Sequence, residues 1–111
     1  MSRTPVHVVT GAMADDRKTL IARLLLARPG WRVLAARGCP CCSGRVETQV
    51  TLARLLREAA PERVLLELAD EQHLGALQRA LGEWPLSRYV EAGRVIRLPD
   101  DGAIAPEALS P

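Results

Sequence analysis

Three cysteines, Cys39, Cys41 and Cys42, lie within four positions and are the only thiols of this 111-residue chain. Thiolates are strong ligands for thiophilic ions such as zinc and copper(I), and several on one short segment lower the entropic cost of assembling a site. The C-x-C-C spacing differs from the C-x₂₋₄-C spacing of closed structural zinc sites. We therefore expect an open metal site whose fourth ligand is water, His73 or a thiol of a second chain. A helix beginning at Ser43 or Gly44 would favour the ionised thiols.

Two other interpretations of the cysteines stay open. A free cysteine is often only a small buried hydrophobic residue. A thiol redox module is the second alternative, although the spacing is not C-x-x-C and a disulfide between adjacent Cys41 and Cys42 would close a strained ring. Three thiols in four positions beside two glycines favour the metal site over both alternatives.

The segment VTGAMADDRKTL begins like a phosphate-binding loop, GxxxxGK[ST], in which glycines, a lysine and a hydroxyl hold phosphates and magnesium. Counted from Gly11, Asp16 stands at the second glycine and Arg17 at the lysine. Lys18 and Thr19 could replace the Lys-Thr pair only with a one-residue insertion, and nearby aspartates would repel phosphate. We expect an ordinary helix N-cap by an aspartate here, with Gly11, Lys18 and Thr19 as a vestigial phosphate site and no nucleotide bound.

Three other polar residues carry weaker signals. His7 alternates within an apolar run, so we expect a hydrogen-bonded residue of a sheet rather than a ligand. His73 is expected on an exposed helix surface, with completion of a metal site as the alternative. Glu67 ends a predicted strand and is either a relic of magnesium handling or a residue that faces the cleft.

The elements that position these residues follow from hydrophobic periodicity. Four short apolar runs, typical of strands covered on both faces, span 6–10, 31–36, 63–68 and 94–98. Between them, three helices are predicted from apolar stripes: Leu20, Ile21, Leu24 and Leu25; then Val46, Val50, Ala53 and Leu56; then Leu74, Leu77 and Leu81, after a cap at Asp70. A short fourth helix is predicted over 85–92.

The alternation of strands and helices predicts a three-layer α/β/α domain with a mostly parallel sheet of about four strands. We place this single domain at residues 1–98. Residues 99–111, PDDGAIAPEALSP, are expected to form an extended C-terminal tail.

Taken together, VVTG followed by a helix with KTL, GCPCC ahead of a second helix, and PERVLLELAD as a later strand resemble the CobW family of P-loop GTPases and metallochaperones. The similarity covers about Val6 to Leu98, and its specific part is GCPCC before an amphipathic helix. The resemblance implies a P-loop NTPase-like fold. It also implies that Cys39, Cys41 and Cys42 hold the delivered metal, usually zinc.

The chain departs from the CobW pattern in ways that bear on function. The phosphate loop is degenerate, the segment between the second strand and the cysteines is missing, and only Glu67 remains of the motif after the third strand. We also expect the guanine-specificity motif and the family's C-terminal domain to be absent. These departures imply a relative that binds a thiophilic metal, in metal homeostasis, without NTP hydrolysis. A residual GTP-binding or GTPase domain and a non-catalytic interaction domain are the alternatives.

Composition narrows the expected partners. With 48% apolar and 25% charged residues the chain fits one globular domain, and its 15 basic and 13 acidic residues are scattered, so we expect no nucleic-acid partner. Trp31, Trp84 and Tyr89 are expected to pack in the interior. No apolar run approaches the roughly 18–20 residues that span a bilayer, so we expect a cytoplasmic protein without a membrane partner. The expected partners are a metal ion and a client or homologous protein, and a homodimer is permitted.

Overall fold

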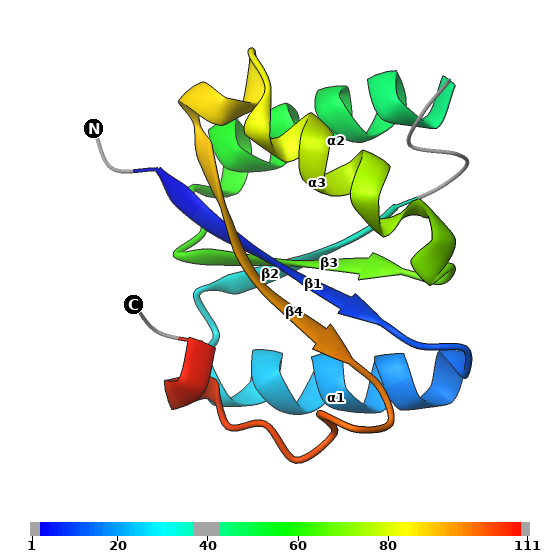
Figure 1. Cartoon of the computed structure of the whole chain (residues 1–111). Coiled ribbons are helices and arrows are strands. Elements are labelled where there is room, and N and C mark those ends of the chain that lie inside the picture. Colours follow the sequence, from blue (N-terminus) through cyan, green and yellow to red (C-terminus); the bar gives the residue numbers. More distant parts are fainter. Residues whose placement is uncertain (1–2, 37–42, 110–111) are drawn as a thin grey trace.

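The computed structural model describes residues 3–36 and 43–109, and these ranges form an all-parallel four-stranded sheet flanked by helices. In chain order the elements are β1 (Thr4–Thr10), α1 (Ala14–Ala27), β2 (Trp31–Ala35), α2 (Ser43–Ala59), β3 (Arg63–Leu68), η1 (Glu71–His73), α3 (Leu74–Gly82), η2 (Leu86–Arg88), β4 (Val90–Arg97) and η3 (Pro106–Leu109). The strand order is β2-β3-β1-β4. Figure 1 shows α1 below the sheet and α2 and α3 above it, which confirms the predicted three-layer α/β/α fold.

The core consists of two apolar layers, one on each face of the sheet. The layer under α2 and α3 contains Val6, Val8, Leu52, Val64, Leu66, Leu68, Leu74, Leu77, Leu81, Leu86 and Val90. The layer over α1 contains Val9, Leu20, Ile21, Leu24, Trp31, Leu65, Ile96 and Leu109. Since β1 and β3 contribute to both layers, their continuous apolar runs follow from burial on both faces.

The predicted apolar face of α1 is confirmed, because Leu20, Ile21 and Leu24 are buried. The predicted aspartate N-cap is wrong. Met13 occupies the N-cap without a side-chain hydrogen bond, and Asp15 and Asp16 lie in the first turn. Carboxylates in that turn still interact favourably with the helix dipole. No helix in the described part of the chain is long and apolar enough to cross a membrane.

The prediction for the inward face of α2 is wrong at most of its positions. Val46, Val50 and Ala53 are exposed, whereas Leu52 is fully buried and Thr48 is buried beside it. The sequence offers two apolar stripes on this helix. The one that packs on the sheet carries Leu52, and because leucine has a larger apolar surface than valine or alanine, that orientation removes more apolar area from water.

The chain after α3 also differs from the prediction. A fourth helix over 85–92 does not form; the single turn η2 occupies 86–88, and β4 begins at Val90, four residues earlier than expected. Residues 99–109, expected to be extended, instead form turns and the 3₁₀ helix η3. Leu109 is buried against the α1 face of the sheet, so apolar contact holds this segment in place (Figure 1).

The aromatic residues divide into two groups. Trp31 is buried in the layer over α1, as predicted. Trp84 and Tyr89 are exposed, so their predicted packing role is wrong. Both lie in the connection from α3 to β4, outside the two core layers.

Candidate functional site

The sheet has a topological switch point between β1 and β3. These strands are neighbours and parallel, but β1 continues into α1 on one face and β3 continues through η1 into α3 on the other (Figure 1). In open parallel sheets, the crevice beyond the carboxyl ends of such a strand pair is the usual ligand site. We call the ends of β1 and β3, with the residues that follow them, the carboxyl edge.

An internal ion pair fills the centre of the carboxyl edge. Arg17, in the first turn of α1, donates from Nε to Glu67 Oε2 over 2.8 Å, and its Nη1 donates to the carbonyl oxygen of Gly11. The two side chains are only 10% and 17% exposed. Opposite charges at this distance in a largely dehydrated setting are strongly coupled. The guanidinium therefore uses its Nε and Nη1 to hold together the end of β3 and the β1–α1 loop.

The pairing of Arg17 with Glu67 was not predicted from the sequence. Its signal was available, because Arg17 stands where a phosphate loop needs lysine and Glu67 ends the third apolar run. The two residues are 50 positions apart, however, and only the adjacency of β1 and β3 brings them together. Glu67 lies near the carboxyl end of β3 with its carboxylate on Arg17, and neither of its two predicted roles is tested by this contact.

The three residues of the vestigial phosphate site lie in different surroundings. Gly11 packs so closely on Leu98 that a Cβ at Gly11 would lie 2.9 Å from the Cβ of Leu98. Lys18 is exposed. Thr19 lines a hollow of about 210 Å³ with Asp16, on the side of α1 that faces the turn at Gly102. A lysine and a hydroxyl placed in this way do not form a cradle for phosphate and magnesium around the β1–α1 loop.

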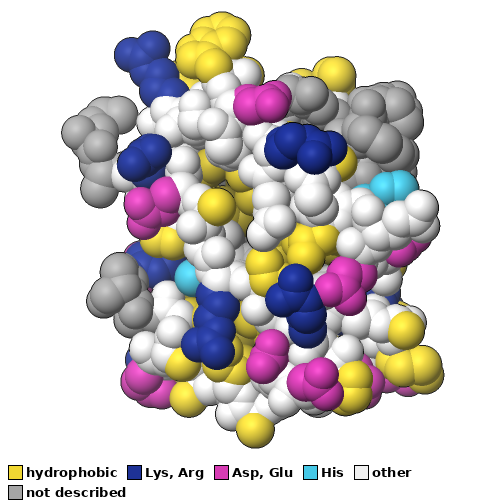
Figure 2. All heavy atoms as spheres, in the orientation of Figure 1, with side chains coloured by type: hydrophobic (Ala, Val, Ile, Leu, Met, Phe, Trp, Pro, Cys, Tyr) yellow, Lys and Arg dark blue, Asp and Glu magenta, His cyan; other side chains and the backbone are white. Residues whose placement is uncertain are grey.

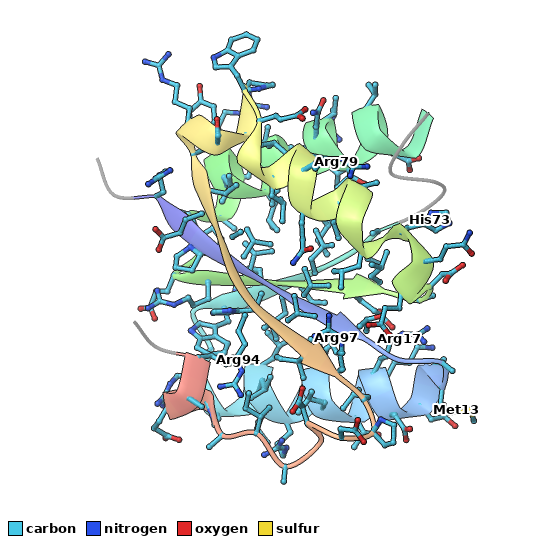
Figure 3. All side chains as sticks on the ribbon, viewed as in Figure 1. Met13, Arg17, His73, Arg79, Arg94 and Arg97 are labelled. Atoms are coloured by element: carbon cyan, nitrogen blue, oxygen red, sulfur yellow. The ribbon has the colours of Figure 1, made fainter. Side chains whose placement is uncertain are left out.

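A second, more exposed ion pair borders the same edge. Arg97, at the end of β4, donates from Nε to Glu71 Oε1 over 2.6 Å, and its backbone N–H donates to Asp101 Oδ2 over 2.9 Å. Asp70 caps η1 by accepting from the backbone N–H of Gln72. Figure 3 shows Arg17 and His73 at this end of the sheet, from α1 and η1 respectively. The edge thus carries paired charges of both signs.

His73 and the acidic residues of η1 do not make a metal site on their own. Nε2 of His73 lies 3.9 Å from Asp70 Oδ2, which is beyond hydrogen-bond distance. Among residues 3–36 and 43–109, no three His, Cys, Asp or Glu side chains are grouped so that they could hold a metal ion. The predicted ligands Cys39, Cys41 and Cys42 lie outside the described residues.

The expected role of His7 as a hydrogen-bonded sheet residue is confirmed, in a specific form. The pairing of β1 with β4 shifts register between Val6 and Val8, and at this bulge the backbone N–H of Arg94 donates to His7 Nδ1 over 2.9 Å. The imidazole takes the place of a strand partner for that amide. It also occupies the space beside Gly93, where a Cβ would lie 2.3 Å from Nδ1.

The surroundings of His7 favour the neutral imidazole. Burial lowers the pKa of His7 below its usual value, the nearby backbone of Leu109 acts in the opposite direction, and the charges of Arg63 and Arg94 lower the pKa further. Because Nδ1 accepts the hydrogen bond from Arg94, the proton of the neutral ring resides on Nε2. His7 therefore connects β1 to the bulge of β4, while its Nε2 is buried without a hydrogen-bond partner among the described residues.

A hollow of about 230 Å³ adjoins the end of β2. It is lined by Leu34 and Ala35 of β2 and by Glu47, Thr48 and Thr51 of α2.

Charges are distributed without a basic stripe on the face shown in Figure 2, where Lys or Arg side chains alternate with Asp or Glu.

Comparison with known proteins adds no family assignment: no protein-family model, curated protein or solved structure matches the chain.

Proposed function

We propose that this protein binds a thiophilic metal ion, with zinc as the first candidate, through Cys39, Cys41 and Cys42, and that it does so without nucleotide turnover. The observation that carries the proposal is three thiols in four positions of a short connection between a strand and a helix. The resemblance to CobW metallochaperones of the same cysteine stretch, GCPCC ahead of a helix, supports the same assignment.

The described residues on either side of the cysteines support the proposal. β2 ends at Ala35, the backbone N–H of Ala36 donates to the carbonyl oxygen of Glu67, and α2 begins at Ser43. The cysteines therefore belong to a connection that leaves the sheet beside the end of β3. In parallel sheets, connections at the carboxyl ends of strands commonly carry function.

The β1–α1 loop favours metal binding over the alternative of a residual GTPase. A phosphate group there would have to compete with Glu67 for the guanidinium of Arg17, while Lys18 is exposed and Thr19 lines a hollow beside Gly102. Displacing a carboxylate from a largely buried arginine costs the free energy of that pair. We therefore assign the chain no nucleotide-dependent step.

The test is a titration of the fully reduced protein with zinc and with copper(I), in competition with a chromophoric chelator of micromolar affinity. We expect up to one ion per chain, release of protons as the thiols ionise, and weaker binding as the pH falls. Replacing Cys41 and Cys42 together by serine should abolish binding, and the single replacement Cys39→Ser should weaken it.

Circular dichroism of the variants distinguishes this site from a structural zinc site. The core layers are built from strands and helices outside the cysteine connection, so we expect the Cys41→Ser, Cys42→Ser protein to keep its helical signal and its cooperative melting. If the reduced wild-type protein removes no zinc or copper(I) from the chelator, the proposal is refuted and the cysteines are packing residues.

A further inference from the structure

An apolar stripe on α2 faces away from the sheet. Val46, Val50 and Ala53 follow one another at helical spacing, and the two valines are 61% and 53% exposed. We call these three residues the α2 stripe. Single exposed apolar side chains are common, but three in a row on one side of a helix form a continuous surface of the kind that packs on another helix.

The surface continues beside the α2 stripe. A mainly apolar hollow of about 330 Å³ is lined by Ala53, Leu56 and Arg57 of α2 and by Tyr89, which precedes β4. Tyr89 is itself exposed. Ala53 belongs to both the stripe and the hollow, so the apolar surface extends from the second turn of α2 to the chain segment before β4.

The charges that flank the α2 stripe are complementary to a second copy of the same helix. In an antiparallel pair of α2 helices with their centre between Val50 and Ala53, Val50 lies opposite Ala53 of the other copy. Glu47 directly follows Val46 and Arg54 directly follows Ala53, so both lie on the same flank of the α2 stripe. In an antiparallel helix pair, residues on this flank of one helix face residues on the same flank of the other. Glu47 of each copy then faces Arg54 of the other, so a two-fold axis yields two opposite-charge contacts.

These groups are available for that contact. In the part of the chain that the structure describes, neither Glu47 nor Arg54 takes part in an ion pair, and both side chains are exposed. Within one helix the two residues are seven positions apart and too distant to pair with each other. Their opposite charges match a partner only when the partner helix runs in the opposite direction.

We infer that the α2 stripe is a self-association surface, on which α2 of a second copy of this chain docks antiparallel around a two-fold axis. Apolar burial by the valines supplies the attraction, and the Glu47–Arg54 contacts set the direction of the helices. One helix with its neighbouring hollow is a small interface, so we expect a dimer that dissociates at micromolar concentrations.

This association does not depend on metal. The cysteines precede the first residue of α2, and α2 has 17 residues, so an antiparallel pair separates the two cysteine connections by about the helix length of 25 Å. The apolar and charged contacts of this arrangement all lie within α2, so it needs no ion shared between the two copies. Experiments can therefore reject dimerisation through α2 without rejecting metal binding by the cysteines, and the reverse.

The test is sedimentation velocity of the reduced chain with a chelator present, over a concentration range of about 5 to 500 µM. We expect the mass to rise with concentration from that of one 12.1 kDa chain to that of two. Val50→Glu should weaken the dimer about tenfold or more, because it places a charge in the contact. Leu26→Glu is the matched control: Leu26 is 85% exposed on α1, on the other face of the sheet, and its replacement should leave the dimer intact.

A charge exchange tests the direction of the helices and does not require a change to the apolar residues. Glu47→Arg and Arg54→Glu should each weaken the dimer, since each creates two like-charge contacts, and the double variant should restore it. The inference is overturned if the wild-type chain stays monomeric throughout, in which case the stripe serves another partner. It is equally overturned if the double variant is folded and remains as weak as the single variants.

Discussion

Arg17 Nε and Glu67 Oε2 lie 2.8 Å apart and join the first turn of α1 to the end of β3. This contact connects two elements that leave the sheet on opposite faces. It places the only largely buried ion pair among the described residues at the switch point, where a phosphate-binding site would need free donors. The pair is therefore central both to stability and to the expected absence of nucleotide binding.

Removing one partner of this pair should destabilise the fold. In Arg17→Ala the Glu67 carboxylate stays largely buried without its cation, and we expect the free energy of unfolding to fall by about 2–4 kcal/mol. The control is Arg97→Ala, which breaks a pair whose side chains are 53% and 57% exposed, and which should cost about 1 kcal/mol or less. Urea denaturation followed by circular dichroism measures both. Equal losses in the two variants would contradict the assigned difference in burial.

Nucleotides should not bind to the β1–α1 loop. Because Arg17 donates to Glu67 and Gly11, and an aspartate rather than a glycine precedes Arg17, GTP or ATP with magnesium should give no binding heat at submillimolar concentrations in isothermal titration calorimetry. The same titration of Lys18→Ala provides the comparison. A saturable micromolar isotherm for the wild-type chain that disappears in Lys18→Ala would restore the GTPase alternative.

Stability should depend on pH through His7. The folded-state pKa of His7 is lowered, so the unfolded chain binds more protons as the pH falls below the unfolded pKa of about 6.5. The contribution of neutral His7 to the free energy of unfolding is thus fully present above the unfolded pKa, and it is lost progressively as the pH falls toward the folded pKa. The slope contributed by this single group cannot exceed about 1.4 kcal/mol per pH unit.

Urea midpoints between about pH 5.5 and 7.5 measure this dependence, a window chosen to lie above the titration of ordinary carboxylates. His7→Gln should lose the His7 contribution to the slope. His73→Gln, which removes the chain's other histidine, should retain it. Identical slopes for the wild-type chain and His7→Gln would show that His7 titrates alike in the folded and unfolded states.

The glycine at the β4 bulge should tolerate no side chain. In Gly93→Ala the new Cβ would lie 2.3 Å from His7 Nδ1, so either the imidazole or the bulge must move, and we expect a loss of about 1–3 kcal/mol. Gly75→Ala is the matched control. No atom lies within 4 Å of a Cβ at Gly75, and alanine in α3 should stabilise the helix by about 0.5–1 kcal/mol.

Thermal melts of the two alanine variants, read beside the wild-type chain, should shift in opposite directions. A neutral Gly93→Ala would mean that His7 is free to rotate away, and the hydrogen bond to Arg94 would then contribute little to the fold.

The sequence alone determined the class of fold and the order of its elements. Continuous Val and Leu runs such as the one ending at Leu68 predict strands buried on both faces, and their alternation with helical stripes leaves a parallel sheet as the simplest arrangement. It also determined the apolar face of α1, because Leu20, Ile21 and Leu24 offer only one inward orientation. These inferences depend on local periodicity, which is a property of neighbouring residues.

Tertiary structure decided the rest, because the sequence left equivalent local choices open. The helix α2 has two apolar stripes, and packing on the sheet selected the one with Leu52, which left Val46 and Val50 outside. The segment 85–92 has some helical periodicity, yet pairing with β1 draws its end into β4.

The partners of the polar residues could not be read from local pattern at all. Arg17 and Glu67 are 50 positions apart, and His7 and Arg94 are 87 apart. Such pairs depend on the strand order β2-β3-β1-β4, which sets β1 between β3 and β4. Hydrophobic periodicity specifies which residues are buried, whereas the spatial order of the strands specifies which buried charges and donors meet.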